Sequence, residues 1–97
     1  MIIHKTQTDS TITLALTGKL DSVTQSDLAR ELETIFETRL TALVFDLSEL
    51  EYISSAGLRV FLAAQKKVKS LGASMKIVGA SAEVQEIFQI IKFDFNV

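Results

Sequence analysis

The chain has 97 residues, 47% of them hydrophobic and 23% charged, which is the size and balance of one folded domain that we expect to span residues 1–97. The formal net charge is −2, and the lysines and arginines are spread along the chain, which excludes the clustered basic surface that a nucleic-acid partner requires. Cysteine is absent, which excludes disulfides and cysteine-ligated metals, and no apolar run approaches the ~20 residues of a membrane span, so we expect a cytoplasmic protein without direct membrane insertion.

Two strands are predicted at the N-terminus. Residues 2–8 suit a first strand, and residues 11–16 alternate apolar and polar side chains, as a strand buried on one face does. Asp9 and Ser10 form a polar turn between them, which favours an antiparallel hairpin. Residues 18–21 are expected to end the second strand.

A helix and a central strand are predicted next. From about Thr24 to Thr38, apolar residues recur at the spacing of an amphipathic helix, namely Leu28, Leu32, Ile35 and Phe36. Residues 42–45 form a continuous apolar run closed by Asp46, which is typical of a strand covered on both faces in a parallel sheet. We therefore expect this strand to lie in the middle of the sheet.

The last part of the chain predicts a helix, a short strand and a third helix. Residues 55–70 suit a helix that ends before Gly72, with an apolar stripe formed by Leu58, Phe61, Leu62 and Val68. Residues 75–78 suit a strand. Ser81 then suits the N-cap of a helix whose apolar stripe consists of Val84, Ile87, Phe88 and Ile91.

The predicted order of elements is ββαβαβα. Strands and helices that alternate in this way predict an α/β fold with a mixed, mostly parallel sheet, an N-terminal antiparallel hairpin and right-handed crossovers. Functional groups in such folds gather on the loops beyond the carboxyl ends of the strands. Asp46, Ser54 and Ser55 are expected at this edge, and Asp21 joins them if the second strand runs parallel to the third.

Ser54 and Ser55 stand at the start of the second predicted helix, and a serine there has two interpretations. In the structural one, its hydroxyl caps the helix by accepting a hydrogen bond from an N–H group of the first turn. In the functional one, a phosphoryl group faces the same N–H groups and the positive end of the helix dipole, and adds about −1.5 to −2 charges to a docking surface. The residue pattern leaves both interpretations open.

Catalytic chemistry finds little support in the sequence. A hydrolytic role for Ser55 needs a base, and the only histidine, His4, lies on the first predicted strand. Asp21 and Asp46 lack the spacing of a metal site, so we expect no metal, no cofactor and no enzymatic activity. Asp21 is interpreted as a cap of the first helix or as part of a docking surface. Two charged helix faces are interpreted as solvated surfaces, an acidic one of Glu31, Glu33 and Glu37 and a basic one of Lys66, Lys67 and Lys69.

The segment Ile53–Arg59 reads Ile-Ser-Ser-Ala-Gly-Leu-Arg and resembles the signature of STAS domains, the group that contains bacterial anti-sigma factor antagonists. Three other segments are similar to parts of that family in the same order. Leu16–Asp21 resembles its glycine-containing turn before the first helix, Val44–Ser48 its central strand, and Gly72–Val78 its later strand. The resemblance therefore covers nearly the whole chain.

In the commonest form of the family, an aspartate precedes two hydroxyl residues, and the first hydroxyl is phosphorylated. The resemblance places Ser55 at that position, with Ser54 as the second choice; Ser54 replaces the aspartate and Ala56 the second hydroxyl residue. It implies a protein that binds an anti-sigma factor with serine kinase activity, is switched off by phosphorylation of Ser55, and is reactivated by a serine phosphatase. The residues implied to contact the partner are Asp21, Ser54, Ser55, Gly57 and Leu58, with Gly57 letting the partner approach closely and Leu58 straddling core and surface.

A second interpretation stays open, because some members of the family lack a regulated serine. In that case the chain would be a constitutive STAS binding subunit of a transporter or a lipid-trafficking complex. The final residues, Phe93–Val97, are interpreted either as closing the core or as a self-association segment.

Overall fold

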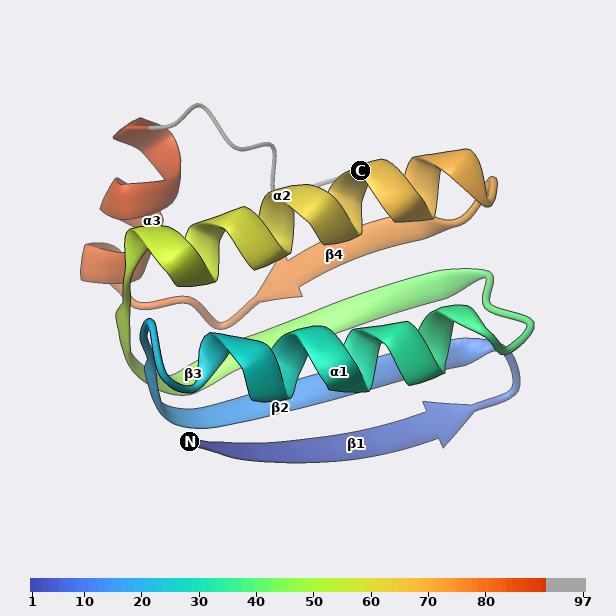
Figure 1. The fold of residues 1–97 in the computed structure, drawn as a ribbon, viewed down its shortest axis with the longest axis horizontal. Coiled ribbons are helices and arrows are strands. Elements are labelled where there is room, and N and C mark those ends of the chain that lie inside the picture. Colours follow the sequence, from blue (N-terminus) through green and yellow to red (C-terminus); the bar gives the residue numbers. More distant parts are fainter. Residues whose placement is uncertain (91–97) are drawn as a thin grey trace.

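The computed structural model describes residues 1–90, and it shows a four-stranded sheet with helices α1 and α2 lying side by side over one face and α3 packed beside α2 (Figure 1). The elements are β1 (Ile2–Thr8), β2 (Thr11–Leu20), α1 (Gln25–Phe36), β3 (Ala42–Ile53), α2 (Ser55–Ser70), β4 (Ser74–Val78) and α3 (Ala82–Ile90). The strand order is β1-β2-β3-β4. The β1–β2 pair is antiparallel and the other two pairs are parallel, which confirms the predicted α/β fold and the order ββαβαβα.

The N-terminal hairpin forms as predicted. Its register runs from Ile2 opposite Thr17 to Thr8 opposite Thr11. Asp9 adopts the left-handed conformation, with φ at 56°, in the turn between the strands, and aspartate tolerates this conformation better than most residues. The hairpin leaves β1 at the edge of the sheet.

The core lies between the sheet and the two long helices. The buried positions predicted from the helical spacing of α1 are confirmed at Leu28, Leu32 and Ile35, while Phe36 is half-buried. Three phenylalanines link the layers, since the ring centroid of Phe61 on α2 lies 4.7 Å from that of Phe45 on β3 and 5.5 Å from that of Phe88 on α3, both with edge-on geometry. Phe88 thereby fixes α3 to α2.

Two expectations about burial are wrong. Leu62, assigned to the apolar stripe of the second helix, is 36% exposed, because the face of α2 that meets the sheet is centred on Leu58, Phe61, Ala64 and Val68. The third strand does lie in the middle of the sheet, but within residues 1–90 only one of its faces is closed, since Leu43 and Phe45 are buried and Val44 is half-buried. Ile91 and residues 93–97 lie outside the described residues.

Strands β2 and β3 are longer than predicted. β2 continues to Leu20 and β3 to Ile53, although the sequence indicated a loop after Asp46. The pairing explains this difference, because the partner of residue 15 is residue 46 and the partner of residue 17 is residue 49, and a second shift follows at residues 18 and 19. Each shift inserts one extra residue into β3. The extra residues break the alternation of two that identifies a strand, and the buried side chains fall at every third position instead, at Leu47, Leu50 and Ile53.

Candidate functional site

The parallel pairing of β2 and β3 brings two loops together at the carboxyl ends of these strands. Leu20 ends β2 opposite Ile53, which ends β3. The backbone N–H of Ser54 donates a hydrogen bond of 2.8 Å to the carbonyl of Leu20, which ties the start of α2 to the loop that begins at Asp21. Asp21 and Ser54 therefore share one edge of the sheet, as expected for parallel strands.

Ser54 is the N-cap of α2. Its backbone is extended, with φ −92° and ψ 171°, and its hydroxyl oxygen accepts a hydrogen bond of 3.2 Å from the backbone N–H of Gly57. Its carbonyl accepts from Leu58 N–H at 2.9 Å, which starts the helical ladder. The structural interpretation is therefore confirmed for Ser54, whose side chain is half-buried and engaged in the cap.

Ser55 is the first residue of α2 and is exposed. Among the described residues its hydroxyl makes no hydrogen bond. The N-terminus of a helix carries N–H groups without intrahelical acceptors and the positive end of the helix dipole, so it favours a negatively charged group. A group added to the Ser55 hydroxyl would therefore break no hydrogen bond within the described part of the chain.

Asp21 shapes the loop that faces Ser54. Its Oδ1 accepts hydrogen bonds of 2.9 Å from the backbone N–H groups of Thr24 and Val23, and its carbonyl accepts from Gln25 N–H at 2.9 Å. The bonds from Thr24 and Val23 hold the pKa of the Asp21 carboxyl below its ordinary value, because they stabilise the charged form. The expectation that Asp21 caps the first helix is wrong, since the N-cap of α1 is Thr24; the Asp21 carboxylate instead organises the turn that leads into α1.

Gly57 and Leu58 pack into the interior. A Cβ atom added to Gly57 would lie 2.7 Å from Leu20 Cγ and 3.2 Å from Ile53 Cγ1, so the absence of a side chain lets α2 start directly against the ends of β2 and β3. Leu58 is only 8% exposed, and the expectation that it straddles core and surface is wrong. These two residues pack the start of α2 closely against the sheet, and Leu58 offers little surface to a partner.

Asp46 and His4 lie elsewhere. The longer β3 places Asp46 within the strand and not at its end, and its Oδ1 accepts a hydrogen bond of 3.0 Å from Ser48 N–H. The expectation that Asp46 shares an edge with Ser55 is therefore wrong. His4 is exposed on β1 opposite Ala15 in the hairpin. Within residues 1–90 no group of three or more metal-ligating side chains could hold an ion, and no helix there has the length and apolarity needed to cross a membrane.

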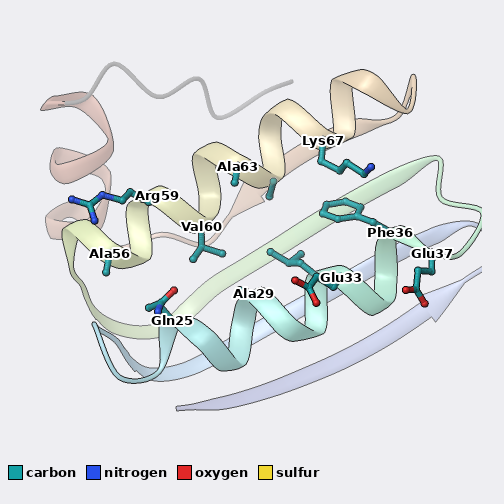
Figure 2. A pocket seen from close by; sticks show the side chains of 12 residues that line it. Gln25, Ala29, Glu33, Phe36, Glu37, Ala56, Arg59, Val60, Ala63 and Lys67 are labelled. Carbon is teal, nitrogen blue, oxygen red and sulfur yellow. The ribbon is translucent and has the colours of Figure 1, made fainter.

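Sequence reasoning missed two features around the serines. Val23 is 78% exposed and Tyr52 is 49% exposed, and they lie on the two segments that the Ser54–Leu20 hydrogen bond joins. The sequence signal that could have indicated these residues was a large hydrophobic or aromatic side chain within each expected loop, Val23 in one and Tyr52 in the other. The second feature is a groove of about 670 Å³ between α1 and α2, which Ala56 and Arg59 help to line close to Ser55 (Figure 2). No pattern along the chain indicates this groove, because its walls come from separate helices.

The chain belongs to the STAS domain family, whose model matches residues 3–97. It is similar to BtrV of Bordetella bronchiseptica, a protein assigned as an anti-sigma factor antagonist, with 32% identity over 85 residues that cover 88% of this chain and 73% of BtrV. This relationship and the family match together identify the chain as a STAS domain.

Solved structures share the fold. An anti-sigma factor antagonist from Mycobacterium paratuberculosis superposes with a TM-score of 0.84 at 21% identity, covering 94% of this chain and 77% of that one. The unphosphorylated anti-sigma factor antagonist SpoIIAA superposes with a TM-score of 0.79 at 16% identity, covering 92% of this chain and 83% of SpoIIAA. The phosphorylated form of SpoIIAA, from Bacillus, gives the same TM-score of 0.79.

Proposed function

We propose that this chain is an anti-sigma factor antagonist. In its unphosphorylated form it binds an anti-sigma factor that has serine kinase activity, phosphorylation of Ser55 releases that partner, and a serine phosphatase restores binding. The observation that carries the proposal is the contrast between Ser54, whose hydroxyl caps α2, and Ser55, whose exposed hydroxyl makes no hydrogen bond among the described residues. The chain would act in the cytoplasm as one domain over residues 1–97, and as a binding protein, not an enzyme.

The comparisons support this proposal in two ways. BtrV, the relative with 32% identity, is assigned as an anti-sigma factor antagonist. SpoIIAA carries the same description and has been solved both with and without its phosphate, and this chain matches the two forms equally well. A fold that is kept in both forms is what an exposed acceptor at a helix N-terminus predicts.

The proposed switch is local and electrostatic. A phosphate on Ser55 adds about −1.5 to −2 charges at neutral pH, which roughly doubles the formal net charge of −2. The cap of Ser54 and the turn of Asp21 use neighbouring groups and stay in place. The partner, however, would meet a dianion on a surface built for a neutral hydroxyl, and the resulting repulsion and desolvation oppose binding.

The proposed contact surface contains Ser55 and its exposed neighbours. Tyr52 and Val23 would supply exposed contact area near the start of α2, and tyrosine in particular is enriched at the centres of protein interfaces. Asp21 and Ser54 would contribute mainly through the turn and the cap that they form, with Gly57 and Leu58 acting from beneath.

Phosphorylation of the purified chain tests the proposal. The chain is incubated with ATP and each anti-sigma factor kinase encoded in the same genome, and its intact mass is measured. One added phosphate is expected, which Ser55→Ala abolishes and the matched control Ser54→Ala retains. Titration calorimetry should then show binding of the unphosphorylated chain and loss of binding for the phosphorylated one. Binding with no change in mass would refute the switch and support the constitutive binding subunit instead.

A further inference from the structure

The groove between α1 and α2 has the shape and lining of a binding site. Its volume is about 670 Å³, and most of the residues that line it are apolar, including Leu32 on α1 and Val60, Ala63 and Ala64 on α2 (Figure 2). Sites that bind ligands or peptide segments in proteins are commonly of this size and composition. α1 has 12 residues and is thus about 18 Å long, so the groove can hold about three turns of a helix.

The two rims of the groove carry opposite charges. Glu33 on α1 and Glu37 at its C-cap line one side of the groove, and Arg59 and Lys67 on α2 line the other, with Lys67 at the end near Glu37 and Arg59 at the end near Ala56 (Figure 2). All four side chains belong to exposed residues. In the described part of the chain none of them takes part in a salt bridge. The groove therefore offers one acidic and one basic rim to whatever binds there.

We infer that this groove receives an amphipathic helix of the partner that reads Ser55, so the inference rests on the proposed function and names how that partner docks. The helix would place an apolar stripe on the floor, with basic residues along Glu33 and Glu37 and acidic residues along Arg59 and Lys67. Binding of an amphipathic helix in an apolar groove is a common mode of protein recognition.

The charges on the rims disfavour a purely anionic occupant. A nucleic acid or a phosphorylated metabolite carries one sign of charge and would be repelled by Glu33 and Glu37. A second copy of the chain in the groove would make the chain self-associate, and size-exclusion chromatography would detect that outcome.

Arg59 connects the groove with the serine. It lies one helical turn after Ser55, and Figure 2 shows its side chain directed toward the N-terminal end of α2. Residues spaced in this way lie on the same face of a helix. A phosphate on Ser55 would attract the Arg59 guanidinium away from the basic rim, because charge-assisted bonds between arginine and phosphate are strong. Phosphorylation would thus weaken docking in the groove as well as at the serine itself.

A set of designed peptides tests the groove without any kinase. Three stapled helices of about 12 residues share one apolar stripe and differ in their edges, which are Lys and Glu in the first, Lys only in the second and Glu only in the third. Fluorescence anisotropy at low salt should show the first binding about tenfold more tightly than the other two, because each of these meets one repulsive rim. Equal binding of all three peptides would overturn the inference.

A matched pair of variants locates the binding. Ala63 is exposed and lines the groove, so Ala63→Trp should fill it and weaken binding of the mixed-edge peptide at least about tenfold. Leu62 is its exposed neighbour outside the groove, and Leu62→Trp should leave binding unchanged. Circular dichroism confirms that both variants fold. Equal effects of the two variants would overturn the inference, and so would a chain that self-associates through Ala63.

The anti-sigma factor kinase completes the test. Ala63→Trp should weaken its binding at least about tenfold, and Leu62→Trp should not. If Ser55 is phosphorylated but the three peptides bind equally and Ala63→Trp has no effect, the groove is rejected as the docking site and the proposed function stands. Groove binding without phosphorylation of Ser55 would reject the switch, and the two proposals are thereby separable.

Discussion

Gly57 stands where α2 begins, and the interior leaves no room for a side chain there. In Gly57→Ala the new methyl group would lie 2.7 Å from Leu20 Cγ, 2.9 Å from Leu20 Cδ2 and 3.2 Å from Ile53 Cγ1. Leu20 is 0% and Ile53 is 3% exposed, so neither side chain can turn toward solvent to make space. The substitution must therefore shift the first turn of α2 or force Leu20 out of its rotamer.

Two opposing terms set the size of the effect. An added methyl group in a packed core costs about 1–3 kcal/mol, whereas alanine is about 1 kcal/mol better than glycine inside a helix. The net loss in the free energy of unfolding should be about 1 kcal/mol. The diagnostic quantity is the coupling energy between Gly57→Ala and Leu20→Ala, because Leu20→Ala removes the two nearest obstructing atoms and leaves only Ile53 Cγ1, at 3.2 Å. In that background Gly57→Ala should stabilise the chain by up to about 1 kcal/mol.

Urea denaturation followed by circular dichroism measures all four proteins of this cycle. Leu20→Ala alone should cost about 2–5 kcal/mol. The expected coupling energy between the two positions is about 1–3 kcal/mol. Effects of the two substitutions that add to within about 0.5 kcal/mol would refute the packing argument.

Three further predictions test other contacts of the site and the core. Ser54→Ala should lower the free energy of unfolding by about 1 kcal/mol through loss of the cap, and Ser55→Ala should change it by less than about 0.5 kcal/mol; equal losses in urea titrations would contradict the assignment of the cap. Phe88→Ala should cost about 3–5 kcal/mol in thermal or urea unfolding, because its buried ring joins α3 to α2, and a near-neutral result would place α3 outside the cooperative core. Hydrogen bonds lower the pKa of Asp21 from its ordinary 3.8, so the stability they contribute is present above that value and is lost as the pH falls through the lower folded pKa. Asp21→Asn should remove this part of the acid dependence, and an unchanged dependence between pH 5 and pH 2 would show that the carboxylate contributes nothing.

The helices could be predicted closely because their signals are local. The apolar spacing indicated a helix from about Thr24 to Thr38 and one over residues 55–70, and the structure has Gln25–Phe36 and Ser55–Ser70. Each boundary depends on side chains within a turn of it, such as the serine that caps α2. The position of the serines at a helix start could be predicted for the same reason.

The length of β3 could not be predicted, because it depends on pairing with β2, which residues 42–53 alone do not determine. Two extra residues are accommodated against β2, and they turn the pattern of Leu47, Leu50 and Ile53 into one that indicates a loop. The burial of Gly57 likewise depends on Leu20, which arrives from a distant part of the sequence. Contacts between segments that are far apart in the chain determine both features.

The role of the charged helix faces could not be predicted either, because it depends on two helices that are separate in the sequence. Glu33 and Glu37 form part of an acidic face on one helix and Lys67 part of a basic face on another, and each face alone is what any solvated helix presents. Only the parallel packing of α1 and α2 places the two faces across an apolar floor. The functional meaning of the charges lies in that juxtaposition.

The neighbours of Ser55 explain why charge, and not refolding, can carry the proposed switch. Ser54 makes the cap and Gly57 makes the close contact with the sheet, so the structural tasks at this helix start belong to the residues on either side. A phosphate on Ser54 would alter the oxygen that caps α2 and so act on the start of the helix itself. A phosphate on Ser55 leaves both contacts intact and changes only what a partner meets at the surface, with Arg59 one turn away to carry the change into the groove. Division of the two tasks between adjacent serines therefore lets the fold stay rigid while its docking surface gains negative charge.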